Sequence, residues 1–169
     1  MIEAFSIHTL ALGAGRGGIC RMPGRYGDYP GDLAAIVAWA PALVLSMATG
    51  PELRAKGAGG LGADLAAAGI DWRHVPVDDY AAQSHALEFD WPEASALAHR
   101  LLASGKGVVA HCMGGCGRSG MALMRLMVEA GDDADPALAR LRDIRPCAVE
   151  TEDQRAWAAR PMWERLRRG

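Results

Sequence analysis

The sequence predicts an α/β fold in which helices flank a central, mainly parallel sheet, within a single domain that spans residues 1–169. Short apolar segments of the kind used by buried parallel strands occur at Leu43–Met47, Trp72–Val77 and Val108–Ala110. Segments with helical signals lie between them, and strands that alternate with helices are typical of a parallel sheet. Half of the 169 residues are hydrophobic, which is enough for one sizeable core.

The N-terminal part is expected to contain strands and loops. Ile2–Leu12 has enough β-prone residues for one or two strands, and the glycine-rich segment 13–18 that follows is expected to be turns. A second loop is expected over residues 20–31. Its arginines, Arg21 and Arg25, are candidates for contact with an anionic substrate, although surface arginines commonly have no such role.

Helix signals accompany each apolar segment. Asp32 is expected to cap a helix that runs to about Ala40, where Pro41 ends it, and Pro51–Arg54 is expected to be a turn. The later helices are expected at Leu61–Ala68 before Gly69, from the Asp90, Pro92 and Glu93 start to Ser104, at Ala122–Ala130, and from Pro136 to Arg145.

Composition excludes several classes of protein. The net charge is −2, and the one basic cluster, R-L-R-R at residues 165–168, is better explained as a solvated helix end, so we expect no nucleic-acid partner. The apolar stretch Leu33–Leu45 is too short for a membrane span and the N-terminus lacks signal-peptide features, so we expect no membrane association. Four scattered cysteines suggest no disulfide framework and hence a reducing cytoplasm.

The segment from Gly107 to Met121 carries the chemistry, with a strand, a glycine-rich loop and a helix in succession. Gly114, Gly115 and Gly117 allow backbone N–H groups to point inward around an anion, and the following helix adds its positive N-terminal end. Arg118 supplies a planar fork for two phosphate oxygens, and the same positive field favours the thiolate form of Cys112. This pattern suits attack by a thiolate on a phosphate group.

Core packing and metal binding are two competing roles for the same residues. A cysteine at a strand end is commonly a small core residue, but core packing requires neither an arginine six positions later nor three intervening glycines. His111, Cys112 and Cys116 are close enough in sequence to suggest a metal site, yet no second cluster supplies further ligands. We therefore expect no metal and no cofactor.

The string H-C-M-G-G-C-G-R-S-G matches the signature H-C-x-x-G-x-x-R-[ST]-G, and so resembles the protein tyrosine phosphatase superfamily. Its G-G-x-G-R-S form is similar to the cyclin-dependent-kinase-associated group of dual-specificity-like enzymes, and C-R-M-P-G near the N-terminus resembles a structural turn of that group. The resemblance implies a phosphatase-like α/β fold with Cys112 as nucleophile, Arg118 as phosphoryl clamp and Ser119 steadying the leaving thiolate. It also implies that His111 orients the cysteine and that the backbone amides from Met113 to Arg118, including Cys116, line the phosphate cradle.

A general acid is expected just after the strand at Trp72–Val77. An Asp-Asp pair after a strand is commonly a polar turn, but a phosphatase needs a proton donor for the leaving oxygen. The segment H-V-P-V-D-D-Y resembles the family pattern H-x-P-[IV]-x-D-x, which implies Asp79 as the acid and leaves Asp78 as the alternative.

A C-terminal segment, R-P-C-A-V-E-T-E-D-Q, contains the capping-box pair Thr151 and Gln154. Its resemblance to R-x-x-A-[IV]-x-T-x-x-Q in the same group implies that Gln154 helps to place the hydrolytic water. Arg145 and Thr151 are expected to be structural.

The expected activity is a protein phosphatase that hydrolyses phosphotyrosine, with phosphoserine and phosphothreonine also open, through a phosphocysteine intermediate. The alternatives are a weakly catalytic phospho-binding module and a phosphatase for a small non-protein phosphate ester. The partner is thus a phosphorylated protein or a small ester, and the oligomeric state is left open. A separate hypothesis is that Cys116 captures oxidised Cys112 as a reversible disulfide, against the simpler interpretation of Cys116 as a small loop residue.

Overall fold

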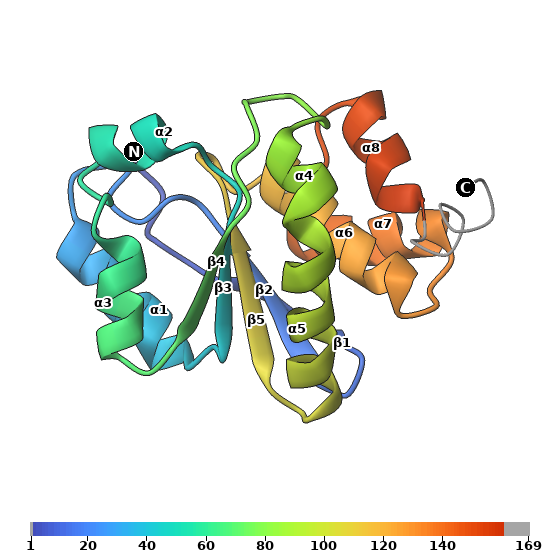
Figure 1. Ribbon diagram of the computed structural model, residues 1–169, viewed down its shortest axis with the longest axis horizontal. Coiled ribbons are helices and arrows are strands. Elements are labelled where there is room, and N and C mark those ends of the chain that lie inside the picture. The colour runs from blue at the N-terminus through green and yellow to red at the C-terminus, as the bar shows by residue number, and fades with distance from the viewer. Residues whose placement is uncertain (1, 161–169) are drawn as a thin grey trace.

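The computed structural model describes residues 2–160, which form a five-stranded sheet with helices on both faces (Figure 1). The strand order is β1-β2-β5-β3-β4; β1 is antiparallel to β2, and the other neighbours are parallel. The strands are β1 (His8–Leu12), β2 (Gly15–Cys20), β3 (Leu43–Ser46), β4 (Asp71–His74) and β5 (Gly107–His111). The predicted α/β fold with a mainly parallel sheet is confirmed.

The helices of the described part fall into two groups (Figure 1). On one face lie α1 (Tyr29–Trp39), α2 (Gly50–Ala55) and α3 (Leu61–Ala67). On the other lie α4 (His85–Phe89), α5 (Trp91–Ala103), α6 (Gly117–Glu129), α7 (Ala134–Ile144) and α8 (Glu152–Ala159). None of these helices is both long and apolar enough to cross a membrane.

Successive side chains of β5 point to opposite faces of the sheet, and the core is divided into two clusters, one on each face. Val108 and Ala110 face the cluster built with α5 to α8, whereas Val109 faces the cluster built with α1 to α3. Helix α6 lies within the larger cluster, and its residues from Gly117 to Val128 are all buried. Such a helix is apolar on most sides because other helices cover it. The loop between β5 and α6 is therefore held from both ends by core elements.

The glycine-rich segment after β1 differs from its prediction, because residues 15–18 belong to strand β2 rather than to turns. These glycines are needed for close packing. A Cβ on Gly15 would lie 2.1 Å from the Lys106 carbonyl oxygen, and one on Gly18 would lie 2.6 Å from the side chain of Ile7. Only the turn at Gly13, with φ of 58°, remains between β1 and β2. Composition alone could not reveal that glycine served packing here.

The first helix begins earlier than predicted. Asp28 is its N-cap and accepts a hydrogen bond from the Gly31 N–H at 3.0 Å. Asp32, predicted as the cap, is instead buried inside the first turn, where its carboxylate accepts from the Gly24 N–H at 2.9 Å. This bond ties α1 to the loop after β2.

Other boundaries also differ. The predicted turn at Pro51–Arg54 lies within helix α2, the short helix α4 was not predicted, and β4 ends at His74 rather than Val77. Asp90 makes no side-chain capping bond, and Glu93 instead pairs with Arg73 at 2.9 Å. The basic cluster at residues 165–168 lies outside the described residues.

Candidate active site

The phosphate-loop candidate runs from Cys112, directly after β5, into the first turn of α6. Cys112 is buried, and its Sγ lies 3.2 Å from the Ser119 Oγ. Gly115 has φ of 73°, and a Cβ there would lie 2.6 Å from the backbone of Cys20 and Arg21. The loop is thus pressed against the end of β2, where a side chain at this position would not fit. Since α6 begins at Gly117, its N-terminal end faces the loop as expected for an anion site.

Arg118 is almost fully buried in the first turn of α6. Its Nη1 donates to Glu52 Oε2 at 2.7 Å and to the Val77 carbonyl at 2.9 Å, and its Nη2 donates to Glu52 Oε1 at 3.0 Å. Its Nη2 also lies 3.4 Å from Asp79 Oδ1. Within residues 2–160 the Nε–H of Arg118 is buried and has no hydrogen-bond partner.

Glu52 is a site residue that the sequence reasoning missed. It also completes the capping box of α2, because its Oε2 accepts from the Thr49 N–H at 2.8 Å. Burial opposes its ionisation, but the bonds from Arg118 and Thr49 outweigh burial and lower the pKa of Glu52 to about 2. The T-x-x-E spacing from Thr49 to Glu52 was the available sequence signal for the helix start.

His111 lies at the end of β5 in a chain of hydrogen bonds. Burial is the main reason that the pKa of His111 falls to about 4, so the ring is neutral near pH 7. Its Nδ1 lies 3.1 Å from the Cys112 carbonyl oxygen, which can only accept, so Nδ1 carries the proton. Its Nε2 therefore accepts from the Ser46 hydroxyl at 2.5 Å, and Ser46 accepts from Trp72 Nε1 at 2.7 Å.

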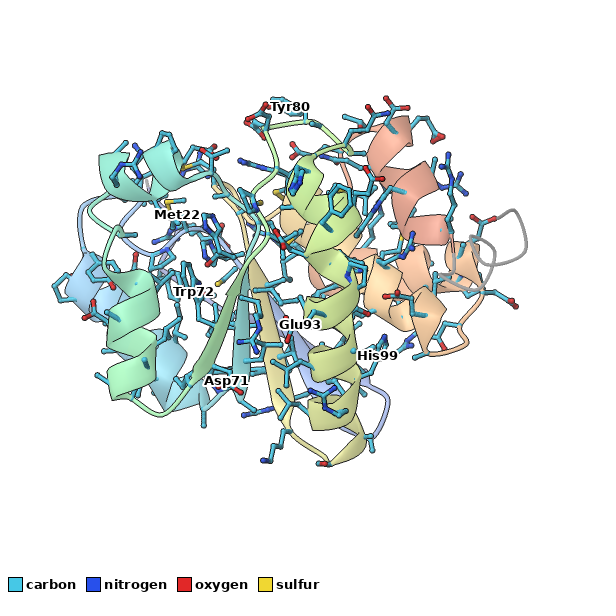
Figure 2. The ribbon with its side chains drawn as sticks, in the orientation of Figure 1. Met22, Asp71, Trp72, Tyr80, Glu93 and His99 are labelled. Atoms are coloured by element: carbon cyan, nitrogen blue, oxygen red, sulfur yellow. A yellow bond between two sulfur atoms is a disulfide. The ribbon has the colours of Figure 1, made fainter. Side chains whose placement is uncertain are left out.

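This chain of hydrogen bonds fixes both the tautomer and the orientation of the His111 imidazole next to Cys112. It runs from β4 through β3 to β5, and Trp72 is labelled on β4 in Figure 2. Neither Ser46 nor Trp72 was singled out from the sequence, because their relation to His111 depends on strand order.

The two aspartates after β4 are placed differently. Asp79 lines the cavity of about 340 Å³ that also contains Cys112, whereas Asp78 does not line it. Asp79 is half exposed, and its Oδ1 accepts from the Tyr80 N–H at 3.0 Å. Tyr80 has φ of 61° and stands on the loop between β4 and α4, at the top of Figure 2. Of the two aspartates, Asp79 is the one that lines this cavity, and its role as the acid stays a prediction.

Gln154 is buried at the start of α8 and serves the predicted capping box. The Thr151 side chain accepts from the Gln154 N–H at 3.1 Å, and the Gln154 Oε1 accepts from the N–H groups of Glu150 and Thr151 at 2.8 and 3.2 Å. A Cβ on Gly117 would lie 2.9 Å from Gln154 Nε2, so the carboxamide adjoins the phosphate loop. Its role toward water stays a prediction.

Cys116 forms a disulfide with Cys147, with 5.2 Å between their Cα atoms. The hypothesis of a Cys112–Cys116 bond is therefore wrong for this form of the protein, as is the prediction that the cysteines would not pair. The expectation of a cytoplasmic setting loses its basis with it. The pairing arises because the segment between α7 and α8 packs on the loop, where Arg145 donates to the carbonyl oxygens of Gly114 and Gly115 at 3.0 and 2.9 Å.

The side chains considered above for a metal site are engaged in other contacts. Across residues 2–160, no group of three or more His, Cys, Asp or Glu side chains is placed to hold a metal ion. The His111 nitrogens are both engaged in hydrogen bonds, and Cys116 is in a disulfide.

Solved structures share this fold. Kinase-associated phosphatase with its catalytic cysteine changed to serine is 20% identical, with a TM-score of 0.80 over 94% of each chain. Tk-PTP in its active form is 28% identical, with a TM-score of 0.65 over 85% of this chain and 88% of that one. PTPMT1 in complex with PI(5)P is 15% identical, with a TM-score of 0.75 over 95% and 98%.

No curated protein matches the chain. A family model does, over residues 47–132, which is half of the chain and includes β5, the loop and α6. That family is described as Tc-R-P, polymorphic toxin system, DSP-PTPase phosphatase. The chain belongs to this family and is a cysteine-based phosphatase of the dual-specificity-like type.

Proposed function

We propose that the protein is a protein phosphatase that hydrolyses phosphotyrosine, with phosphoserine and phosphothreonine as further substrates, through a phosphocysteine intermediate. The observation that carries this proposal is that Cys112 and Asp79 line one cavity, while buried Arg118 lies 3.4 Å from the Asp79 carboxylate. These three groups supply a nucleophile, a cation for the phosphoryl oxygens and a proton donor.

In the first step the Cys112 thiolate attacks phosphorus, so that an S–P bond forms while the P–O bond to the leaving group breaks. Asp79 gives its proton to the departing oxygen. Arg118 and the loop N–H groups hold the phosphoryl oxygens, and the Nε–H of Arg118 has no other partner within residues 2–160.

In the second step water attacks phosphorus and gives its proton to Asp79, while the S–P bond breaks and the thiolate of Cys112 returns. The Ser119 hydroxyl, 3.2 Å from the sulfur, can donate to that thiolate. Gln154 adjoins the loop at Gly117 and is the proposed residue for placing the water.

The first test is hydrolysis of an aryl phosphate by the wild type and by Cys112→Ser, Asp79→Asn and Asp78→Asn. We expect no activity in Cys112→Ser, and a roughly hundredfold or greater loss of kcat in Asp79→Asn, because a positioned general acid contributes about that much. Asp78→Asn is the matched control and should stay near the wild type. Exchanged results for the two aspartates would move the acid by one residue.

Two further measurements decide the finer parts of the proposal. Rapid acid quench and intact-mass analysis should find one phosphoryl group on Cys112 of the wild type and none on Cys112→Ser. Phosphotyrosine and phosphoserine peptides should both be hydrolysed. Tight phosphopeptide binding without turnover would make the protein a binding module, and turnover of small esters alone would make it a phosphatase for non-protein substrates.

A further inference from the structure

A second, smaller cavity of about 70 Å³ adjoins the catalytic one. Three arginines line it, Arg21, Arg25 and Arg145, and we call them the arginine cluster. Arg25, Arg145 and Gly114 line both cavities, so the two spaces meet at the edge of the phosphate loop. The room suits a small anionic group rather than a ring.

The charges of two members of the cluster are not neutralised by nearby acids. Arg21 donates to the carbonyl oxygen of Glu3 at 2.9 Å, and its guanidinium lies 4.8 Å from the Tyr26 ring centroid. The Arg25 guanidinium lies 5.1 Å from the same ring on Tyr26. Across residues 2–160, no carboxylate lies within 4 Å of either guanidinium. The one carboxylate that lines this cavity belongs to the exposed Glu3.

Arg145 adds a third positive charge with only neutral partners. Besides the two loop carbonyl groups, its Nη1 donates to His8 Nε2 at 3.2 Å. Burial is the main reason that the pKa of His8 is lowered; the charge of Arg145 lowers it further, and the charge of Glu3 opposes both. Three guanidinium groups around one small cavity, with a single carboxylate among its lining residues, leave an excess of positive charge that an anionic ligand would balance.

The backbone that carries Arg21 and Arg25 is fixed rather than free. The Met22 N–H donates to the Met113 carbonyl at 3.1 Å, which joins this segment to the phosphate loop, and the Gly24 N–H is held by buried Asp32. The Arg25 Nη1 lies 3.1 Å from the place that a Cβ on Gly114 would occupy. The guanidinium of Arg25 therefore lies against the loop that would hold the scissile phosphate.

We propose that the arginine cluster binds a second anionic group of the substrate, a carboxylate or phosphate on a residue close to the phosphorylated residue of a peptide chain. This inference rests on the proposed function, since it needs the scissile phosphate over Cys112. Exposed Tyr26 lines the smaller cavity and exposed Tyr80 lines the catalytic one. The loop side chains, Met113 and disulfide-bonded Cys116, add no charge for a multiply phosphorylated headgroup.

The test uses a set of phosphotyrosine peptides. Each peptide carries a single glutamate, at one position between three residues before and three residues after the phosphotyrosine, and is compared with the same peptide carrying glutamine there. For the wild type, kcat/KM should be about tenfold higher for glutamate in at least one position, since a hydrogen bond to a charged group is worth that much. In Arg25→Gln the ratio between the two peptides should fall toward one. Added salt should also reduce the wild-type ratio.

Arg100→Gln is the matched control, because it removes the same charge from the exposed end of α5, at the opposite end of β5 from the phosphate loop. It should keep both the basal activity and the preference for glutamate. Equal ratios in the wild type and Arg25→Gln would overturn the inference while leaving the phosphatase intact. No turnover of any peptide or aryl phosphate would instead overturn the proposed function. A soluble phosphoinositide could also be hydrolysed in a way that depends on Arg25, while the glutamate and glutamine peptides are hydrolysed equally well. That result would overturn the assignment of a peptide as the substrate.

Discussion

At the scale of single residues, the position of Arg118 depends on Glu52. Both terminal nitrogens of the guanidinium are bonded to this one carboxylate, which is itself held by the N-terminus of α2. Arg118 thereby gains a fixed orientation before any ligand arrives, and preorganised charge is what phosphoryl transfer needs. Glu52 is a positioning residue in this scheme, because it acts through Arg118.

Replacing Glu52 should therefore weaken both activity and the binding of phosphate. In Glu52→Gln we expect kcat/KM for an aryl phosphate to fall about tenfold to a hundredfold, because Arg118 loses a charged partner worth about 1–3 kcal/mol. Affinity for inorganic phosphate or vanadate, measured by competitive inhibition, should weaken in parallel. Glu93→Gln breaks an exposed pair with Arg73 and is the control, expected within twofold of the wild type. Full activity in Glu52→Gln would contradict the positioning role.

At the scale of elements, the disulfide joins the N-cap of α6 to the segment between α7 and α8. The same segment contains Val149, whose N–H donates to the Cys116 carbonyl at 3.1 Å, and it leads into the helix that carries Gln154. The sequence separation of 31 residues means that the crosslink closes a long loop of the unfolded chain. By the chain-entropy estimate, such a crosslink stabilises the fold by about 3–4 kcal/mol.

Reduction should therefore destabilise the protein by a similar amount. We expect dithiothreitol to lower the free energy of urea-induced unfolding of the wild type by about 2–4 kcal/mol. Cys147→Ser and Cys116→Ser should start near the reduced value and should not respond further to the reductant. A wild type whose unfolding is the same with and without reductant would show that this bond contributes nothing to stability.

The elements also show what the sequence could reveal. Local signals sufficed for the strands at Leu43–Ser46 and Gly107–His111 and for the capping box of Thr151 and Gln154, because each depends on neighbours in the chain. The ion pair between Glu52 and Arg118 joins residues 66 positions apart, so no local sequence pattern could predict it. The Cys116–Cys147 pair was missed for the same reason. Spacing found the loop, but the residues that hold it come from other elements.

At the scale of the whole molecule, two buried or half-buried groups make folding sensitive to acid. Burial keeps the pKa of His111 at about 4 in the folded protein, whereas an unfolded histidine has a pKa of about 6.5. Because the folded value is depressed, this contribution to stability is complete above pH 6.5 and is lost as the pH falls toward 4. The pKa of Glu52 is lowered to about 2, so a second loss of folding stability begins below about pH 4.5.

The first of these losses can be isolated with His111→Asn, which keeps a donor for the Cys112 carbonyl but cannot take up a proton. Between pH 7 and about pH 4.5, the free energy of unfolding of the wild type should fall by about 2 kcal/mol more than that of the variant, because only the unfolded wild type gains a proton at this position. Urea unfolding followed by tryptophan fluorescence at both pH values measures the difference. The sign is fixed by the depressed pKa, so the stabilities of the two proteins should converge as the pH falls. Parallel pH profiles would mean that burial does not shift the pKa of His111 between the folded and unfolded states, and that His111 does not couple protonation to folding.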